Sequence, residues 1–334
     1  MPKPDARQTV KAAALQFAKA TATFKLAAKL TANRLRILCY HGISQEREHR
    51  LSPGTFMTPE TFRARMAFLK KWRANVLSLD EGLRRLREGT LPSRAVVITI
   101  DDGFYSSYAH MLPVLEEHGF PATFYLSTYY MEKQTFVFNL MIPYILQQAS
   151  TQMDGEQMDG RQIVDQGDSS LDAKGREDLC FSTAKRCGYD ADNAKSQRIM
   201  TFMTSSEAAD MHARGFDVQL HTHRHRFPLD DRQTAEQEIK DNVQILADLG
   251  MPSRRHFCYP SGVHATWQAE WLSGLGMESA VTTDFGLATK RDPAFAIPRM
   301  CDSENMTLLE FEAAISGFSD LVFGARRRFR STKQ

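Results

Sequence analysis

Short apolar and β-branched runs recur along the chain from residue 36 onward, separated by longer segments with a helical pattern. Most runs are continuous rather than alternating, which is typical of strands buried on both faces. Strands are therefore expected at 36–40, 75–79, 95–100, 122–127, 216–220, 256–259, 279–283 and 295–300. Helices are expected between them, at 59–72, 79–87, 107–118, 206–214, 232–249, 266–275 and 308–316.

This alternation of strand and helix predicts an α/β fold with a parallel sheet and right-handed crossovers. About eight strands favour a barrel over an open sheet, so we predict a distorted (β/α)7–8 barrel over residues 36–325. Residues 131–205 break the rhythm and predict an inserted lobe, with helices at 136–146 and 197–203 and a mobile acidic tip within 147–178. The lobe is either a lid or substrate-binding element, or a surface decoration.

Both ends of the chain are basic, whereas its body is acidic. Residues 1–36 carry eight Lys and Arg and one acid, and residues 326–334 carry five basic residues and no acid. With a net charge of +2, residues 37–325 therefore carry −10. Two basic ends favour peripheral contact with an anionic membrane surface, and they argue against nucleic acid as a partner.

Residues 1–35 predict one basic amphipathic helix, because Val10, Phe17 and Phe24 recur every seven residues on one face. Such a helix either packs on the barrel or lies on anionic lipid. No apolar run reaches the length of about 18 residues that a membrane-spanning helix needs, and lysines interrupt the region where a signal peptide would be apolar. The five scattered cysteines contain no C-x-x-C pair. We expect a cytoplasmic protein, peripheral to the inner face of the membrane.

Polar residues with metal-binding or catalytic chemistry follow several predicted strands, where barrel enzymes place their active sites. Asp101 and Asp102 directly follow the third strand, and two adjacent carboxylates need a cation or a shifted pKa to ionise together. A solvated strand end that caps the next helix is the other interpretation of this pair. His221 and His225 are four residues apart and can share one ion, whereas His223 between them faces elsewhere. One carboxylate and two imidazoles predict a divalent metal, with Zn²⁺ foremost and Co²⁺, Ni²⁺ or Fe²⁺ as alternatives.

The ordered segments Thr99–Gly103, His221–His225 and Phe257–Gly262 together resemble the motifs of the polysaccharide deacetylase family. This is the NodB-homology group of carbohydrate esterases, carbohydrate esterase family 4. The resemblance covers about residues 36–300. It implies a distorted barrel that removes N-acetyl, or sometimes O-acetyl, groups from sugars with a bound divalent metal. The implied enzyme is a hydrolase of non-peptide carbon–nitrogen bonds in linear amides.

The resemblance also implies roles for individual residues. Asp101 falls at the position of the general base, and Ser261 falls where the third motif supplies a backbone N–H to the oxyanion. Three residues fall at the positions of the metal ligands: Asp102, His221 and His225. Two neighbours of Ser261 are expected to contact substrate: Tyr259 and Gly262.

The sequence departs from the family pattern in two places. Many members carry an arginine that orients the base at the position of Cys258, and Arg299 is our candidate substitute, with an ordinary salt-bridge arginine as the alternative. No histidine follows His264, so the late Leu-x-His motif that supplies the general acid is absent. His41, after the first predicted strand, is the candidate acid, because an imidazole suits protonation of a leaving amine. A histidine that caps a strand end is the other interpretation, and His264 is a weaker candidate.

Taken together, these residues predict a metal-dependent deacetylase that acts on an amino-sugar polysaccharide or a lipid-linked glycan precursor, as in exopolysaccharide biosynthesis. The metal would lower the pKa of a bound water and polarise the acyl carbonyl, while Asp101 takes the proton of the water. Two alternatives remain open. One is an O-acetyl esterase or deformylase that uses the same site on a sugar. The other is a catalytically impaired carbohydrate-binding protein, which the missing arginine and late histidine would explain.

Overall fold

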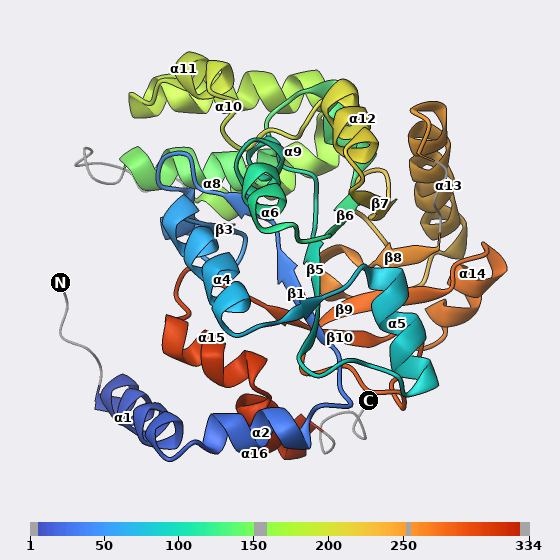
Figure 1. Ribbon diagram of the computed structural model, residues 1–334. Coiled ribbons are helices and arrows are strands. Elements are labelled where there is room, and N and C mark those ends of the chain that lie inside the picture. Colours follow the sequence, from blue (N-terminus) through green and yellow to red (C-terminus); the bar gives the residue numbers. More distant parts are fainter. Residues whose placement is uncertain (1–5, 150–158, 252–254, 328–334) are drawn as a thin grey trace.

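A closed ring of parallel strands lies at the centre of the protein (Figure 1). The computed structural model describes residues 6–149, 159–251 and 255–327. Strand β1 (Arg36–Tyr40) pairs with β10 (Ile297–Cys301) on one side and with β5 (Ala95–Ile100) on the other, which closes the ring. The other strands of this sheet are β4 (Asn75–Val76), β6 (Thr123–Leu126), β7 (Asp217–Leu220), β8 (His256–Cys258) and β9 (Ser279–Phe285). The predicted barrel is confirmed, with seven strands in the ring and β4 beside β5.

Helices surround the barrel between successive strands. Several begin where a side chain satisfies the first free backbone N–H groups. Thr204 and Thr307, for example, each form a capping box with the glutamate three residues later. The helices that surround the barrel are α4 (Pro59–Lys71), α5 (Leu79–Glu88), α6 (Leu112–His118), α12 (Ser205–Ala213), α13 (Arg232–Asp248), α14 (Gln268–Gly274) and α15 (Leu308–Ile315). A π-helical turn at Ser107–Met111 precedes α6.

The ring strands are buried on both faces, as their continuous apolar runs predict. On β5, Ile98 belongs to the large apolar cluster beneath the surrounding helices, whereas Val97 belongs to a second cluster. The second cluster joins Val97 to Ile37 of β1 and to other ring strands, so it fills the interior of the barrel. Side chains alternate along a strand, so Val97, Thr99 and Asp101 all point to the same side, toward the interior of the barrel. The register of β5 therefore directs Asp101 into the mouth of the barrel.

A helical lobe is inserted between β6 and β7 and forms a separate layer at the top of Figure 1. Its helices are α7 (Thr128–Lys133), α8 (Phe138–Ala149), α9 (Gly160–Ser170), α10 (Ala173–Cys187) and α11 (Ala191–Ser196). They share an apolar cluster in which Phe138 and Ile142 of α8 meet Cys180 of α10. Phe104 and Phe202, from the segments that flank the lobe, extend the same cluster toward the barrel. The lobe is therefore a packed body that rests on the mouth of the barrel.

One prediction for the lobe was wrong. Residues 197–203 form turns and an isolated bridge rather than a helix, with Arg198 and Met200 at positive φ. Much of the predicted acidic tip at 147–178 is helical, with Asp159 and Asp172 as the N-caps of α9 and α10. Within that range, residues 150–158 lie outside the described residues.

The N-terminal segment is two helices rather than the single one predicted. α1 (Ala6–Ala20) and α2 (Thr23–Leu30) are separated by a turn in which Ala22 has a φ of 58°. The break rotates Phe24 into a small core with α15 and α16 (Phe318–Arg327), while Val10 and Phe17 stay exposed. The apolar stripe predicted from the seven-residue repeat is therefore split, with Phe24 in the core and Val10 and Phe17 on the surface.

Three short elements between β1 and α4 were not predicted. β2 (Gly42–Ile43) pairs in parallel with β3 (Phe56–Met57), and α3 (Glu48–Leu51) lies between them. Residues 328–334 of the predicted basic tail lie outside the described residues. Within the described part of the chain, no helix has the length and apolar character needed to cross a membrane.

Candidate active site

A pocket of about 620 Å³ opens where the barrel strands end, the position that barrel enzymes use for catalysis. The loops after four ring strands contribute to its lining: His41, Asp101, Asp102, His221, His225 and Ser261. The lobe and its flanks contribute another part of the lining: Phe104, Tyr129, Tyr130, Asn139, Leu140, Arg176 and Phe202. The structure thus brings the strand-end residues together and places the lobe against them.

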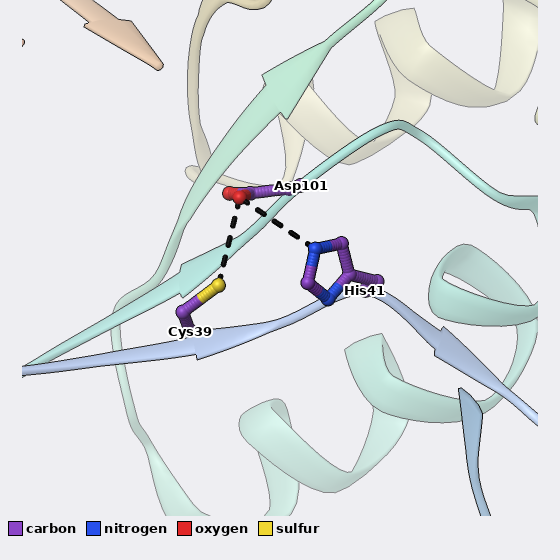
Figure 2. Close-up of side chains that lie close together, drawn as sticks. All are labelled: Cys39, His41 and Asp101. Atoms are coloured by element: carbon purple, nitrogen blue, oxygen red, sulfur yellow. Dashed lines mark hydrogen bonds and ion pairs between the residues drawn. The ribbon is translucent and has the colours of Figure 1, made fainter. Parts of the chain in front are cut away.

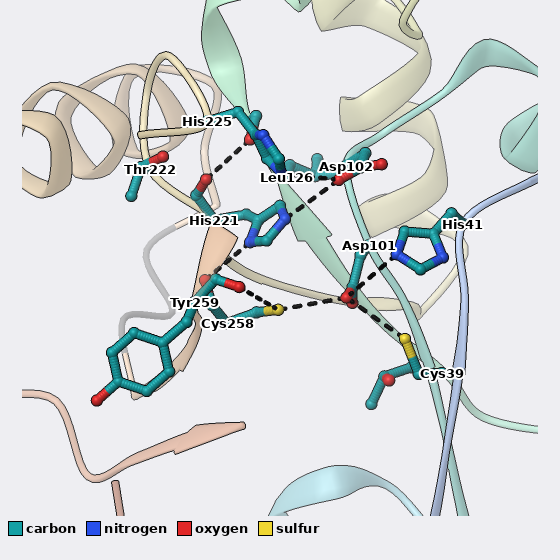
Figure 3. A network of polar contacts seen from close by, with 12 residues as sticks. Cys39, His41, Asp101, Asp102, Leu126, His221, Thr222, His225, Cys258 and Tyr259 are labelled. Carbon is teal, nitrogen blue, oxygen red and sulfur yellow. Dashed lines mark hydrogen bonds and ion pairs between the residues drawn. The ribbon is translucent and has the colours of Figure 1, made fainter. Parts of the chain in front are cut away.

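Asp102 and two histidines converge in this pocket (Figure 3). The Oδ1 atom of Asp102 lies 3.1 Å from Nε2 of His221 and 3.3 Å from Nε2 of His225. The three ligand atoms are all within 4.8 Å of one another. Burial would raise the pKa of Asp102, but hydrogen bonds from the two imidazoles outweigh it and hold this pKa well below its usual range. Asp102 in turn outweighs the effect of burial on His225 and raises the pKa of that imidazole.

The local backbone brings the two imidazoles to the same side. Thr222 and His225 both have positive φ values, 65° and 56°, so the chain makes a tight turn directly after β7. Asn242 of α13 fixes the start of this turn, because its side-chain oxygen accepts the backbone N–H of His221 at 3.1 Å. Asp102 is also at positive φ, 73°, which turns its side chain away from that of Asp101. Such strained positions persist only where surrounding contacts hold them, and they cluster at functional sites.

The hydrogen bonding of His221 tests whether a metal ion fits between these side chains. Its Nδ1 lies 2.8 Å from the carbonyl oxygen of Cys258, which can only accept, so Nδ1 carries the proton. In a neutral imidazole the lone pair is then on Nε2, which faces the carboxylate of Asp102. A proton on Nε2 makes this contact a hydrogen bond, and a divalent cation can take the place of that proton between the two atoms. The donor set and its orientation therefore fit a divalent metal held by Asp102, His221 and His225.

Asp101 is held by a different set of contacts. The guanidinium of Arg299 donates from Nη1 to Oδ1 at 2.8 Å and from Nη2 to Oδ2 at 2.6 Å, a bidentate pair. Both side chains are almost fully buried. Burial alone would raise the pKa of Asp101, but the charge of Arg299 outweighs it and lowers this pKa to about 2. Asp101 is therefore ionised at neutral pH and able to accept a proton.

Arg299 reaches Asp101 across the interior of the barrel mouth. Its Nη1 also donates to Thr99 Oγ1 at 2.9 Å, and its Nε donates to the carbonyl oxygen of Thr282 at 3.0 Å. The Sγ atom of Cys258 lies 3.3 Å from Nη2 of Arg299 and 3.3 Å from Oδ2 of Asp101. The small thiol thus leaves room for the guanidinium that enters from β10. The structure places Arg299 on the carboxylate as a buried partner and not in a surface salt bridge.

His41 approaches Asp101 from the end of β1 (Figure 2). Its Nε2 lies 3.9 Å from Oδ2 of Asp101, and its side chain is 20% exposed to the pocket side of the barrel. Its Nδ1 is buried, and no hydrogen-bond partner for it is found among the described residues. Cys39, two residues earlier on β1, directs its thiol to the same carboxylate at 3.5 Å. His264, the weaker candidate, does not line the pocket; its ring stacks on Tyr259 and its Nδ1 lies 3.1 Å from Gly262 O.

The loop after β8 presents a tight turn to the pocket. Ser261 has a φ of 56°, and Gly262 has a φ of 70°. A Cβ atom on Gly262 would lie 1.9 Å from Oγ1 of Thr283, so only glycine fits there. The N–H of Gly262 donates to Tyr259 O at 2.9 Å, whereas none of the hydrogen bonds found among the described residues uses the N–H of Ser261. The turn therefore has a backbone donor that is available to a ligand.

Tyr259 lines the pocket, but its hydroxyl group is bonded elsewhere. The Tyr259 O–H donates to the carbonyl oxygen of Phe295 at 3.0 Å, and Figure 3 shows the ring directed away from Asp102 and His221. Burial raises the pKa of this hydroxyl. His223 likewise faces away, with its Nδ1 2.9 Å from Thr128 Oγ1, and burial lowers the pKa of its imidazole.

Several site residues had no detectable signal in the sequence. The supporting contacts of Cys39, Thr99 and Asn242 depend on which strands are neighbours and could not be inferred from spacing. The lobe residues Tyr129 and Arg176 come from a region whose helices were only partly predicted.

A family model described as polysaccharide deacetylase matches residues 88–280. The chain belongs to the polysaccharide deacetylase family. Members of this family are hydrolases that act on amide bonds, so the family resemblance and the class of enzyme predicted from the sequence agree with this finding. The matched segment contains Asp101, Asp102 and the two triad histidines, but it ends before Arg299 and begins after His41. The two candidate substitutes, Arg299 and His41, thus lie outside the matched segment, whereas Cys258 lies within it.

The chain is also similar to individual polysaccharide deacetylases. It is 31% identical over 80 residues to a poly-β-1,6-N-acetyl-D-glucosamine N-deacetylase of Staphylococcus epidermidis, a match that spans 24% of this chain and only 28% of that relative's length. The deacetylase PplD of Streptococcus pyogenes, solved in complex with acetate, superposes with a TM-score of 0.60 at 18% identity over 84% of this chain and 98% of that one. IcaB of Ammonifex degensii gives 0.56 at 17% identity over 85% and 97%. These structural similarities support the fold.

Proposed function

We propose that this protein is a metal-dependent deacetylase that removes N-acetyl groups from an amino-sugar polysaccharide or a lipid-linked glycan precursor. The observation that carries the proposal is that the two adjacent carboxylates have different partners. Asp102 faces two imidazole nitrogens, whereas Asp101 is held apart by Arg299 and stays ionised. One carboxylate is thus placed to bind a cation and its neighbour to accept a proton. Membership of the polysaccharide deacetylase family supports the same reaction class.

Asp102, His221 and His225 would hold the metal, and two nitrogens with one oxygen suit Zn²⁺, with Co²⁺, Ni²⁺ or Fe²⁺ as alternatives. When bound, a divalent cation supplies Lewis-acid polarisation of the acyl carbonyl and lowers the pKa of a coordinated water. All three side chains line the pocket, so an acetamido group that entered the pocket would lie beside them.

Asp101 acts as general base in this proposal and takes a proton from the attacking water. The new C–O bond forms as the proton moves to the carboxylate, and the N–H of Ser261 donates to the oxyanion that results. His41 then protonates the nitrogen of the sugar as the C–N bond breaks, which releases acetate and a free amine. The distance of 3.9 Å between His41 Nε2 and Asp101 Oδ2 lets one substrate group contact both.

Acetate release from N-acetylated oligosaccharides by the full-length protein tests this function. We expect acetate release that stops with a chelator and returns with added Zn²⁺ or Co²⁺. Formate release from an N-formyl substrate, or faster acetate release from O-acetyl esters, would instead favour the deformylase or esterase alternative. No release from any of these substrates, in protein with metal bound, would favour a catalytically impaired carbohydrate-binding protein.

We further propose that the protein acts at the cytoplasmic face of a membrane, bound peripherally through its N-terminal helices. Two observations support the membrane contact. Val10 and Phe17 of α1 and Leu26 and Leu30 of α2 are exposed apolar side chains. Lysines lie beside them on α2, at positions 25 and 29, and no ion pair to either is found within the described part of the chain. Exposed apolar groups with neighbouring lysines are the combination that binds an anionic lipid surface.

A further inference from the structure

Three of the five cysteines lie inside the mouth of the barrel, although they are far apart in the sequence. Cys258 of β8 belongs to the apolar cluster that fills the barrel interior. Cys39 follows Ile37, another member of that cluster, by two residues on β1. Cys301 follows Arg299 by two residues on β10. Because side chains alternate along a strand, both Cys39 and Cys301 are directed to the interior.

Two of these thiols contact the carboxylate of Asp101 (Figure 3). The Sγ atoms of Cys39 and Cys258 lie 3.5 Å and 3.3 Å from the same oxygen, Oδ2. Burial raises the pKa of Cys258, and the hydrogen bond to Cys301 together with burial holds the pKa of Cys39 well above its usual range. Both thiols therefore keep their protons and act as weak donors to the carboxylate. A reaction that removes such a proton changes the surroundings of the general base.

Cys39 and Cys301 face each other on neighbouring parallel strands. Their Cα atoms are register partners of β1 and β10, and the N–H of Asp302 donates to the carbonyl oxygen of Cys39 at 3.1 Å. Neighbouring strands lie about 4.8 Å apart, within the range of about 4.4–6.8 Å between Cα atoms that a disulfide spans. Strand β9 separates Cys258 from Cys301, which places these two about twice that spacing apart. The geometry thus favours Cys39 as the partner of Cys301.

Cys301 differs from the other cysteines in exposure and in pKa. It is partly exposed, whereas the other four are buried. The hydrogen bond from the thiol of Cys39 lowers the pKa of Cys301, and the charge of Arg299 acts in the same direction. A partly exposed thiol with thiolate character next to a second thiol is the arrangement found at redox-sensitive cysteines.

We propose that hydrogen peroxide converts Cys301 and Cys39 to a disulfide, and that this bond lowers the activity of the site. The inference rests on the proposed function and names a regulation of it. The Cys301 thiolate attacks one peroxide oxygen and the O–O bond breaks, which leaves a sulfenic acid and, after protonation, a water. The Cys39 sulfur then attacks the Cys301 sulfur, and the S–O bond breaks as a second water leaves. Two thiols lose two electrons and two protons, and the peroxide gains both.

The disulfide acts on the base through the proton that Cys39 loses. Its Sγ no longer donates to Oδ2 of Asp101, and it moves toward β10. The same oxygen lies 3.9 Å from Nε2 of His41, at the end of the strand that carries Cys39. Loss of one hydrogen bond should lower kcat/KM about three- to tenfold, and the loss is partial because Arg299 still holds the carboxylate. At the cytoplasmic location proposed for this protein, disulfides are transient and serve redox sensing.

Treatment of the full-length, metal-bound protein with hydrogen peroxide tests this inference. Peptide mapping without reduction identifies any disulfide, and acetate release from N-acetylated oligosaccharides is measured before treatment, after it and after dithiothreitol. The proteins are wild type, Cys301→Ser and Cys39→Ser. Cys187→Ser is the control, since Cys187 lies in the lobe on α10.

Wild type and Cys187→Ser should form the bond between Cys39 and Cys301 and lose activity about three- to tenfold, and dithiothreitol should restore it. Cys301→Ser should form no disulfide and keep its activity through the treatment. In Cys39→Ser the sulfenic acid on Cys301 has no thiol to react with, so dimedone should trap it there.

Absence of a bond between Cys39 and Cys301 would overturn the inference, as would a bond from either to another cysteine. So would a disulfide that leaves acetate release unchanged, or equal loss of activity in Cys301→Ser. If untreated wild type releases no acetate, the proposed function fails on those substrates, and the peptide map alone then decides the inference. A bond between Cys39 and Cys301 supports the redox site, and its absence overturns it.

Discussion

Asp101 and Asp102 are adjacent in the sequence and both buried, yet each has its own set of partners. The positive φ of Asp102 turns its carboxylate toward the imidazoles, while the alternation of β5 directs Asp101 to Arg299. Two acids that repel each other are thus separated by backbone geometry and by two different sets of partners, the imidazoles for Asp102 and Arg299 for Asp101. The sequence alone could predict that these acids share a site, because they end a buried strand. The family resemblance implied Asp102 as a metal ligand with His221 and His225 and pointed to Arg299 beside Asp101, but the positive φ of Asp102 that separates the two carboxylates could not be predicted from the sequence.

Removal of Arg299 should shift the pH dependence of activity. In wild type the pKa of Asp101 is about 2, so the base stays ionised and activity lost on acidification comes from other groups. In Arg299→Met, burial acts on Asp101 without the opposing charge and raises its pKa, so the acid limb of kcat/KM against pH should move to higher pH. Arg299→Lys, which keeps the charge without the bidentate fork, should lie between the two.

Stability provides a second readout for the same variants. Because Arg299→Met leaves a buried carboxylate unpaired, the free energy of unfolding at neutral pH should fall by about 3–5 kcal/mol. This loss should shrink as the pH falls and Asp101 becomes protonated. An acid limb at the same pH in wild type, Arg299→Lys and Arg299→Met would show that Arg299 does not set the ionisation of the base.

At the scale of secondary-structure elements, the ring strands could be predicted well and the lobe poorly. Strands such as β1 and β5 have continuous apolar runs that end in polar residues, and the structure gives both with the predicted bounds. In the lobe, aspartates that look like loop residues are helix caps, and the stretch from Ile199 to Met203 is buried without being helical. Tertiary packing decides those segments, so local patterns mislead there.

The arginine that contacts the base comes from β10 here, whereas the family motif would place one at Cys258 on β8. Because the Cys258 thiol touches both Arg299 and Asp101, the two positions compete for one space. Cys258→Arg alone should destabilise the protein, since two buried guanidinium groups would crowd one carboxylate. Adding Arg299→Ala should restore part of the loss, with a coupling free energy of about 1–3 kcal/mol in a double-mutant cycle of unfolding.

Cys39→Ala combined with Arg299→Ala serves as the matched control, because Cys39 also contacts Asp101 but offers no replacement guanidinium. The double variant Cys39→Ala/Arg299→Ala should therefore release acetate no faster than Arg299→Ala alone. Strict additivity of Cys258→Arg and Arg299→Ala in both stability and acetate release would contradict the idea that β8 and β10 can exchange this role.

At the scale of the whole molecule, the N-terminal helices are part of the folded body. Lys11 and Lys19 of α1 pair with Glu310 and Glu312 of α15, so part of the basic charge that the sequence assigns to this segment is used internally. Phe24 is buried in the same interface. The surface that is left to contact a membrane is the outer face of α1 and α2. This face is smaller than the continuous apolar stripe predicted from the sequence.

Phe17→Ser combined with Leu30→Ser should weaken the binding of the full-length protein to phosphatidylglycerol vesicles about tenfold or more, since each side chain loses apolar area available to lipid. Both side chains are exposed, at 71% and 61%, so the fold should be unaffected. Val263→Ser is the control, because Val263 is 53% exposed outside these helices. Equal sedimentation of all three proteins with vesicles would contradict the proposed membrane contact.

The central claim is that Asp102 belongs to the metal site whereas Asp101 belongs to proton transfer. Parallel measurement of bound Zn²⁺ and of acetate release in Asp101→Asn and Asp102→Asn tests it most directly. Asp101→Asn should retain the metal and lose activity by a factor of about 10²–10⁴, the usual contribution of a general base. Asp102→Asn should lose the metal, and with it the activity. Asp101→Asn protein that releases acetate at the wild-type rate, or Asp102→Asn protein that binds Zn²⁺ as wild type does, would contradict this account.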